Sequence, residues 1–529
     1  MLIGGVAVMV AIVVAGVLTL LSGSPAPAPK TAAGGSALEP PADPNSAAQQ
    51  YLQDFAAGET GSAGRLTDDP GDSAAALADA WRSLSPSEVQ TTLRSVSPPA
   101  GNTATAAYNT VWTLSAGRQW SYDGTFGLVL TGGVWRVHWT PAVLQPTLQT
   151  GQRLALLTTA PNQTAVVDRD GKPLVTTGPA GPQLTDPVGF KPLKDILASQ
   201  ASTTSNVFAV QRVDAAGHSL QTLFGSTGDQ VKPRSATLSS ALQSAAQSVV
   251  DGYSDGPAVI VAIQPSTGGL LAVAQNGQST ASPFSGLYAP GSTFKIVTAT
   301  AALESGMANP DSALPCPLTA QIGTRTISNE GFALGTTSMR EAFAKSCNTT
   351  FAQLASQLPA NGLANAADQY GLNADFGIPG LNTQTGKVVP ASSANEQVED
   401  GIGQGTVQVS PFGEALMAAT VAAGHAVTPR LWQDAQTGVT TGYTAPPAGG
   451  LASLRTMMRA VVTGGTATGL AGSGPVYGKT GTAQFGSGDE AHGWFVGYRG
   501  DLAFVVFLES SNDSSPAVTL AAQFLAKVS

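Results

Sequence analysis

The sequence predicts an α+β multidomain protein that begins with a transmembrane helix and ends in a domain where helices flank an antiparallel sheet. Three observations indicate this fold class. Residues 1–22 contain no charged side chain. From residue 47 onward, helical periodicity gives way to strand-like alternation. Strand-like runs then stand at both ends of the stretch 237–529, with helical segments between them.

The apolar segment 1–22 is long enough to span the hydrocarbon core of a bilayer. It exceeds the apolar core of a typical signal peptide, so we expect an uncleaved signal anchor, and a cleaved signal peptide is the alternative. A linker rich in Pro, Ala and Gly follows at 23–46. We therefore expect a single-pass protein of the cell membrane whose folded domains are extracytoplasmic.

The composition excludes several classes of partner. The 529 residues carry a net charge of −9 without any block of Lys and Arg, so binding to nucleic acid is not expected. Only four His and two Cys occur, and none has the spacing of a metal site. We expect neither a metal ion nor another cofactor.

Three folded regions are predicted after the linker. Residues 47–147 read as two short amphipathic helices followed by antiparallel strands, which indicates a small α+β domain with a Trp-rich core. Residues 148–236 read as an elongated module with a tight turn at 168–172. In 237–529, an early helix and hairpin and a late meander and helix predict one sheet built from both ends. A helical insertion would cover one side of that sheet.

Ser292 and Lys295 are the first candidates for chemistry. Pro290-Gly291 breaks the chain, and a helix is predicted from there to about Gly306. Ser292 would lie in the first turn, where free N–H groups and the helix dipole favour negative charge. Lys295 would share its face and, when neutral, could take the hydroxyl proton. Lys295 is the only lysine with Ser at this spacing; a surface capping serine with a solvated lysine is the alternative.

A Ser-x-Asn pair at Ser346 and Asn348 is the second candidate. A hydroxyl and an amide two residues apart can share one face of a loop, supplying a proton relay and a substrate hydrogen bond. The pattern is unspecific, since residues 393–395 and 510–512 also match it. We prefer Ser346 because helical segments frame it about fifty residues after the first pair.

The third candidate is Lys479-Thr480-Gly481-Thr482, the only Lys-Thr-Gly in the chain, within a strand-like run. A glycine inside a strand indicates that something approaches the backbone closely, as an extended substrate along a sheet edge would. Lys479 and the Thr hydroxyls could hold a carboxylate, and the N–H of Thr482 could help bind an oxyanion. An ordinary strand ending in a turn is the alternative.

Together and in this order, the three motifs are the signature of penicillin-binding proteins and class A β-lactamases. The sequence resembles the class B penicillin-binding transpeptidases over nearly its whole length, through GLYAPGSTFK, YGKTGTAQF and HGWFVGY. The segment VVDRDGKPL is similar to the start of their pedestal module. Residues 47–147 resemble the nuclear-transport-factor-like (cystatin-like) domain of the low-affinity subgroup. The resemblance implies a dimerisation-type pedestal at 148–236 and a β-lactamase-like transpeptidase domain at 237–529.

By matching position, the resemblance implies roles for the motifs. Ser292 would form the acyl-enzyme, Lys295 would act as base, Ser346 would relay the proton and Asn348 would bind the substrate amide. The Lys479 motif would receive the terminal carboxylate. The substrates would be peptidoglycan stem peptides ending in D-Ala-D-Ala, and β-lactam antibiotics would acylate the same serine. Other cell-wall synthesis proteins are expected partners.

Other functions stay open at this point. A D,D-carboxypeptidase or a β-lactamase of the same fold is one alternative, although no residue between Asn348 and Lys479 matches the glutamate that activates the deacylating water in class A enzymes. A penicillin-binding sensor or non-catalytic scaffold is another. Glycosyltransferase activity is not expected, because the modules before residue 237 lack the carboxylate-rich sequence that its acid/base chemistry requires.

Cys316 and Cys347 are the only cysteines in the chain. The expected extracytoplasmic location permits a disulfide between them across the helical insertion, and two free thiols are the alternative. Such a bond would anchor the loop that carries Ser346 and Asn348. Cys347 is also a departure from the family pattern, and it would make this loop sensitive to redox state.

Overall fold

The computed structural model describes residues 43–158, 163–178, 180–202, 207–228, 231–280, 282–485 and 490–528. The predicted anchor at 1–22, and the linker as far as residue 42, lie outside the described residues. Within these ranges, no helix combines the length and the apolar character needed to cross a membrane. The chain divides into two compact units, Met1–Ala160 with Thr204–Asp229 and Pro161–Thr203 with Gln230–Ser529.

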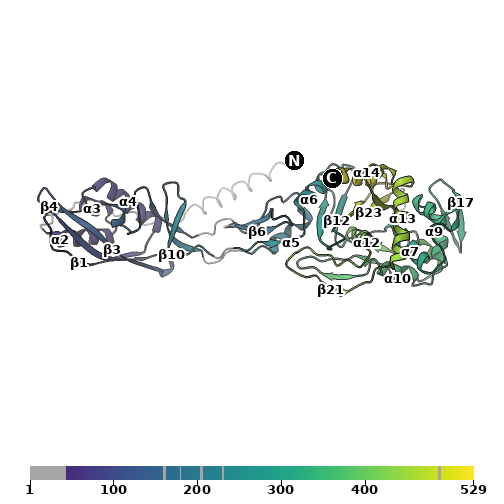
Figure 1. The fold of residues 1–529 in the computed structure, drawn as a ribbon, viewed down its shortest axis with the longest axis horizontal. Helices are drawn as coiled ribbons and strands as arrows, with labels where there is room; N and C mark the ends of the chain where they lie inside the picture. The colour runs from purple at the N-terminus through teal and green to yellow at the C-terminus, as the bar shows by residue number, and fades with distance from the viewer. Residues whose placement is uncertain are drawn as a thin grey trace, which may run out of the picture. The chain divides into compact units, whose positions relative to one another are not determined.

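The first unit packs helices against a four-stranded antiparallel sheet of order β1-β2-β3-β4 (Figure 1). Asp43 and Asp69 cap two of its helices by accepting backbone N–H bonds, and a proline follows each cap. The elements are α2 (Pro44–Ala56), α3 (Thr60–Arg65), α4 (Pro70–Leu84), β1 (Glu88–Val96), β2 (Thr103–Thr113), η1 (Ser115–Gly117), β3 (Gln119–Thr131), β4 (Val134–Val137) and η2 (Pro141–Val143).

The core of the first unit is aromatic. Burial alternates along β2, so every second side chain of that strand points into the core. Trp112 and Trp120 are buried there, and Phe55 of α2 meets Trp112 edge to face. The Trp-rich stretch therefore supplies packing, as the sequence indicates.

The predicted module at 148–236 is divided between the two units. Strand β9 (Phe208–Val213) pairs with both β5 (Arg153–Leu157) and β10 (Ser219–Ser226) in the first unit. Leu154 and Val210 join its aromatic core. The segment between β5 and β9 belongs to the second unit instead. The division follows from pairing between strands that are distant in sequence, which a linear pattern does not contain.

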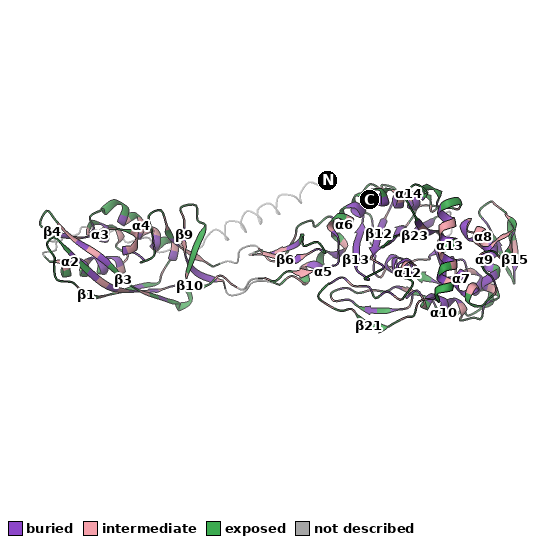
Figure 2. Ribbon diagram, in the orientation of Figure 1, coloured by how far each residue is buried: buried purple, intermediate pink, exposed green. Residues whose placement is uncertain are grey.

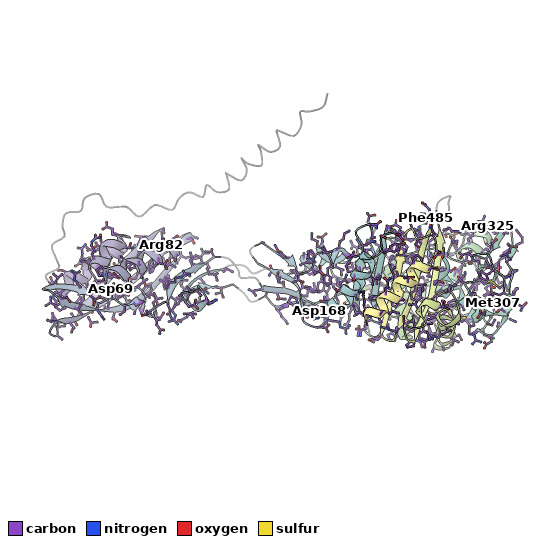
Figure 3. All side chains as sticks on the ribbon, turned by 90° about the horizontal axis from the view of Figure 1, so that it is seen from above. Asp69, Arg82, Asp168, Met307, Arg325 and Phe485 are labelled. Carbon is purple, nitrogen blue, oxygen red and sulfur yellow. A yellow bond between two sulfur atoms is a disulfide. The ribbon has the colours of Figure 1, made fainter. Side chains whose placement is uncertain are left out.

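The part of this module in the second unit forms a four-stranded sheet of order β11-β6-β7-β8. The turn at 168–172 joins β6 to β7, as predicted. Asp168, which Figure 3 labels, accepts N–H bonds from Asp170 and Lys172. Its other oxygen accepts from the backbone and hydroxyl of Ser240 at the start of α6. The elements are β6 (Gln163–Val167), β7 (Pro173–Thr177), β8 (Gln183–Leu184), η3 (Lys191–Leu193), α5 (Lys194–Ser199) and β11 (Arg234–Ser235).

A five-stranded antiparallel sheet of order β13-β12-β24-β23-β22 forms the centre of the second unit. It combines two early strands with three late ones, which confirms assembly from both ends of 237–529. Every residue of β12 and β13 is buried, and Figure 2 shows these central strands in the buried class. The elements are α6 (Ser240–Asp251), β12 (Ala258–Ile263), β13 (Leu270–Gln275), β22 (Val476–Gln484), β23 (Ala491–Arg499), β24 (Leu502–Leu508) and α14 (Ser515–Lys527).

Helices cover both faces of this sheet. Helix α12 packs across β12, β23 and β24, while α6 and α14 pack against the sheet and against each other. The helices of the insertion are η4 (Gly291–Phe294), α7 (Lys295–Glu304), α8 (Met339–Ala344), α9 (Asn348–Ser356), α10 (Gly362–Asp368), α11 (Ala394–Asp400), α12 (Pro411–Ala423), α13 (Ala448–Gly464) and η5 (Thr468–Leu470). Its strand pairs are β14 (Ala313–Cys316) with β17 (Gly335–Ser338), β15 (Thr319–Ile322) with β16 (Arg325–Ser328), β18 (Asp375–Gly377) with β21 (Gly438–Thr441), and β19 (Gly386–Lys387) with β20 (Gln408–Val409).

Candidate active site

Ser292 lies in the 3₁₀ turn η4, directly before the α-helix that begins at Lys295. The turn is pressed against strand β22. Gly291 has a φ of +55°, and a Cβ at this position would stand 2.3 Å from the carbonyl oxygen of Thr482. Only glycine fits such a left-handed, crowded position. The close packing fixes Ser292 beside the strand that carries the Lys-Thr-Gly motif.

Lys295 is fully buried and its Nζ is surrounded by oxygen atoms. It lies 2.7 Å from the carbonyl oxygen of Ser346, 2.6 Å from Oδ1 of Asn348 and 2.9 Å from Oγ of Ser292. The first two oxygens can only accept, so they take up two N–H bonds. A neutral amine then has one lone pair left, which can accept the hydrogen bond of the Ser292 hydroxyl.

The charge state of Lys295 agrees with this geometry. Burial, and secondarily the nearby charge of Lys479, hold the pKa of Lys295 well below its usual range. A neutral lysine with its lone pair on a serine hydroxyl is a base placed for proton removal. The sequence pattern predicted the pairing of Ser292 with Lys295, and the structure brings the two side chains together.

Ser346 and Asn348 reach the same point from the loop between α8 and α9. Ser346 has a φ of +63°, an unfavourable conformation for a residue other than glycine. In that conformation both its carbonyl oxygen and its hydroxyl face Lys295. Asn348 donates through Nδ2 to the carbonyl of Ser328 at 3.0 Å, which leaves its Oδ1 for Lys295.

Lys479 completes the group from strand β22. Its Nζ donates to Oγ of Ser346 at 3.1 Å, so the Ser346 hydroxyl bridges the two lysines. Burial lowers the pKa of Lys479 to about 7, with the charge of Glu330 opposing that shift. The pKa of Lys479 is therefore close to neutral pH, so a carboxylate bound beside it would determine whether Lys479 is charged.

The reason for Gly481 differs from the sequence-based prediction. A Cβ on Gly481 would stand 2.6 Å from the carbonyl oxygen of Pro290 and 2.8 Å from Cγ2 of Thr293. The group that approaches the strand at this glycine is the turn that carries Ser292. Thr480 and Thr482 line the cavity, and Oγ1 of Thr480 is hydrogen-bonded to that of Thr466 at 2.6 Å.

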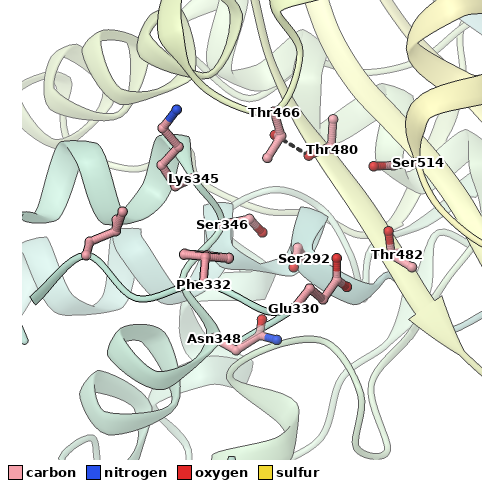
Figure 4. A pocket seen from close by; sticks show the side chains of 11 residues that line it. Ser292, Glu330, Phe332, Lys345, Ser346, Asn348, Thr466, Thr480, Thr482 and Ser514 are labelled. Atoms are coloured by element: carbon pink, nitrogen blue, oxygen red, sulfur yellow. Dashed lines mark hydrogen bonds between the residues drawn. The ribbon is translucent and has the colours of Figure 1, made fainter. Parts of the chain in front are cut away.

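A cavity of about 450 Å³ opens in front of these groups (Figure 4). Ser292, Ser346 and Asn348 line it together with Thr480 and Thr482. Neither of the other two Ser-x-Asn matches, at 393–395 and 510–512, contributes a residue to the lining of this cavity. Ser393 caps α11. The sequence motifs did not indicate the remaining lining residues, which are Glu330, Phe332, Leu334, Lys345, Thr466 and Ser514.

Cys316 and Cys347 form a disulfide across 31 residues of chain. Cys347 stands between Ser346 and Asn348, and the buried Asn329 places its Nδ2 within 3.4 and 3.5 Å of the two sulfur atoms. The bond therefore attaches the Ser346–Asn348 loop to β14. Closing a loop of this length contributes roughly 4 kcal/mol in the chain-entropy account.

We expect reduction of this disulfide to slow acylation of Ser292 severalfold, because the loop that holds Lys295 loses its covalent attachment. The measurement is the rate of labelling by a fluorescent penicillin before and after reduction. Cys316→Ala, which removes the bond without touching the Ser346–Asn348 loop, should show the same loss. An unchanged rate in protein whose two free thiols are verified by mass would contradict this prediction.

Behind the nucleophile turn lies a buried carboxyl group, Glu414 of α12. Its Oε1 is 2.8 Å from Oγ1 of Thr293, which is also 2.9 Å from the carbonyl oxygen of Pro290. The single Thr293 proton cannot serve both acceptors, but a protonated Glu414 can donate to Thr293 while Thr293 donates to Pro290. Burial raises the pKa of Glu414 to about 8, which favours this protonated form.

Glu414 makes the stability of the second unit depend on pH. The folded state keeps the proton that the unfolded chain releases above pH 4.5, so stability falls as pH rises from 4.5 to about 8. The loss is on the order of 4 kcal/mol. Glu414→Gln should abolish it, as measured by denaturant unfolding at pH 5 and pH 8. An identical pH dependence in both proteins would exclude this role for Glu414.

Comparison with known proteins gives two family matches. Residues 258–528 match the family described as penicillin binding protein transpeptidase domain, and residues 43–152 match the NTF2-like N-terminal transpeptidase domain. The second match confirms the small N-terminal domain that the sequence resemblance implies, and the first confirms the resemblance to penicillin-binding transpeptidases.

Curated relatives and solved structures agree with these matches. Peptidoglycan D,D-transpeptidase PbpA of Mycobacterium tuberculosis is 32% identical over an alignment of 205 residues, and the match covers 32% of this chain and 42% of that protein. The PbpA of Mycolicibacterium smegmatis is 32% identical over 227 residues, 35% of this chain and 45% of that protein. The chain thus matches less than half the length of these relatives.

Two solved structures share the fold. Pseudomonas aeruginosa PBP2 has a TM-score of 0.56 at 22% identity and covers 70% of this chain and 95% of its own. PBPA from Mycobacterium tuberculosis has a TM-score of 0.53 at 20% identity, covering 69% of this chain and 98% of its own. At such identities the likeness concerns the fold alone.

Proposed function

Since this chain belongs to the penicillin binding protein transpeptidase domain family, we propose that it is a serine-type peptidoglycan D,D-transpeptidase that works through an acyl-enzyme on Ser292. The observation that carries the proposal is the 2.9 Å contact between Oγ of Ser292 and Nζ of the buried Lys295, whose pKa is held well below its usual range. The substrates are peptidoglycan stem peptides ending in D-Ala-D-Ala.

Acylation begins with transfer of the Ser292 proton to Lys295. The Oγ of Ser292 then bonds to the carbonyl carbon of the penultimate D-alanine, and the bond from that carbon to the terminal D-alanine nitrogen breaks. The leaving nitrogen takes a proton that passes from Lys295 through Ser346. The 3.2 Å separation between Nζ of Lys295 and Oγ of Ser346 supports this relay.

Lys479, Thr480 and Thr482 receive the terminal carboxylate of the donor peptide. A pKa near 7 lets Lys479 gain its charge when an anion binds beside it, and the carboxylate then offsets the burial of that charge. The backbone N–H groups of Ser292 and Thr482 are the proposed oxyanion donors, because the two residues line one cavity.

The remaining parts of the chain are proposed to place this domain at its substrate. Residues 1–22 anchor the protein in the cell membrane with the folded part outside, and 23–46 act as a linker. The proposed domains are 47–147 as the NTF2-like domain, 148–236 as the pedestal and 237–529 as the transpeptidase. The family matches at 43–152 and 258–528 support the first and last of these. Other cell-wall synthesis proteins are proposed partners.

The test uses benzylpenicillin and a D-alanyl peptide ester with intact-mass spectrometry. We expect one penicilloyl adduct on the Ser292 peptide that persists for many minutes. The ester-derived acyl group should leave faster when D-alanine is added, because a transpeptidase accepts an amine. Turnover of the penicilloyl adduct within seconds, without any effect of amines, would identify a β-lactamase. Hydrolysis of the ester that amines do not alter would identify a D,D-carboxypeptidase.

A further inference from the structure

Glu330 is the one acidic residue among the described residues that line the active-site cavity. Resting on the function proposed above, we propose that Glu330 binds the ammonium group of the acceptor peptide and takes its proton before that amine attacks the acyl-enzyme. The proposal concerns the second half of the reaction, for which the three sequence motifs assign no residue.

The carboxylate of Glu330 is available for a ligand. Figure 4 shows the side chain pointing into the cavity, toward Ser292 and Thr482 in that view. Glu330 is exposed, and none of the hydrogen bonds or ion pairs formed among the described residues involves its carboxylate. An unneutralised negative charge at the mouth of the site attracts a cationic group.

The backbone that carries Glu330 is held rigidly. Its neighbour Asn329 is buried and accepts N–H bonds from Asn348 at 2.7 Å and Thr349 at 3.2 Å. Asn329 also donates to the carbonyl of Pro317 at 2.8 Å. Because Asn348 itself contacts Lys295, these bonds tie the position of Glu330 to the catalytic group. Such fixed placement is what a proton-accepting residue requires.

The lysines near the cavity have partners within the protein. Lys479 is buried, and its Nζ donates to Oγ of Ser346 at 3.1 Å and to the carbonyl of Thr480 at 3.0 Å. Lys345 also lines the cavity, but its Nζ donates to the carbonyl of Gly464 at 2.7 Å. The charge of Glu330 is felt at the reaction centre, where it acts to raise the pKa of both Lys295 and Lys479. An acceptor ammonium would therefore meet its counter-charge on the Glu330 side.

Aminolysis requires a group that takes a proton from the acceptor ammonium. An alkylammonium ion has no lone pair, so it must lose a proton before it can attack an ester. Glu330 accepts that proton, and the neutral nitrogen bonds to the acyl carbon of the Ser292 ester. As the bond from carbon to Oγ breaks, a second proton from nitrogen returns to Oγ through Ser346 and Lys295. Glu330 then releases its proton to water, which balances the reaction.

The test compares Glu330→Gln with wild type and with Glu304→Gln, an exposed acid on α7 outside the cavity. Penicillin acylation should remain within a few-fold of wild type in Glu304→Gln. The acylation rate of Glu330→Gln is measured separately, because the charge of Glu330 also acts on Lys295 and Lys479. With a D-alanyl ester and D-alanine at neutral pH, Glu330→Gln should lower the ratio of aminolysis to hydrolysis by roughly 100-fold. The ratio should recover as pH approaches the pKa of the acceptor amine.

Hydroxylamine supplies a second readout, because it is already neutral at neutral pH. Its aminolysis should be nearly unchanged in Glu330→Gln, and Glu330→Asp should restore part of the reaction with D-alanine. Three results for Glu330→Gln would each overturn the role of Glu330. The ratio of aminolysis to hydrolysis with D-alanine could be unchanged, aminolysis by hydroxylamine could fall as much as aminolysis by D-alanine, or only hydrolysis could be slower. The proposed function fails separately, when wild type itself takes no penicilloyl label.

Discussion

Replacing Ser292 by alanine is expected to abolish the covalent penicilloyl adduct completely. Among the described residues, Ser292 and Ser346 are the two that line the cavity and place a hydroxyl in contact with Lys295. The hydroxyl of Ser346 also contacts Lys479, whereas that of Ser292 does not. Loss of the Oγ atom removes the bond-forming group itself, so no residual rate from another base can compensate.

The measurement is intact mass after exposure to benzylpenicillin, followed by identification of the labelled peptide. Ser514→Ala is the matched control, since Ser514 lines the same cavity but contacts neither lysine. That variant should label stoichiometrically. A Ser292→Ala protein that still gains one adduct would show that another residue is the nucleophile, and it would remove the basis of the proposed acyl-enzyme.

Lys295→Ala should reduce the rate of acylation by roughly 1,000-fold, the contribution of a well-placed general base. Lys295→Arg should be equally slow, because arginine stays protonated and offers no lone pair. In wild type, burial holds the pKa of Lys295 well below its usual range, so the neutral base persists to lower pH than in an ordinary lysine. The rate should decline only as pH falls far enough to protonate the amine.

The time course of labelling by a fluorescent penicillin measures these acylation rates, and circular dichroism checks that each variant is folded. Lys345→Ala is the control, because Lys345 lines the cavity but donates to the Gly464 carbonyl instead of the catalytic group. It should retain acylation within a few-fold. Substantial acylation in Lys295→Arg would contradict the role of a neutral lysine as base.

Several parts of the fold could be predicted because they depend on neighbouring residues. Strands β12 and β24 read as unbroken apolar runs, and the structure buries nearly all of their residues. Strand β1 (Glu88–Val96) was not predicted, since most of its residues are exposed or half-buried and its sequence lacks a clear apolar alternation. The split of 148–236 was missed for another reason, namely that β5 pairs with β9 across an inserted segment.

The candidate site divides in the same manner. Ser292, Lys295 and Lys479 belong to patterns that occur once in the chain, so the sequence alone was enough to select them. The Ser-x-Asn pattern occurs three times, and the contacts of Ser346 with both lysines distinguish it from the others. Glu330 belongs to no motif, and only the lining of the cavity brings it to attention.

By itself, then, the sequence determined which candidate reactive groups the protein carries and their order along the chain, because the motifs of the proposed nucleophile, base and anion-binding residues are each local. The tertiary structure determined the pKa values, packing and orientation of these residues. The pKa of Lys295 is depressed because folding buries it, and secondarily because Lys479 lies nearby. Gly481 is required because the turn of Ser292 packs against it. Glu330 faces the nucleophile because Asn329 bonds to the Ser346–Asn348 loop. Burial, close packing and long-range hydrogen bonds arise only when distant segments meet, so no local pattern encodes them.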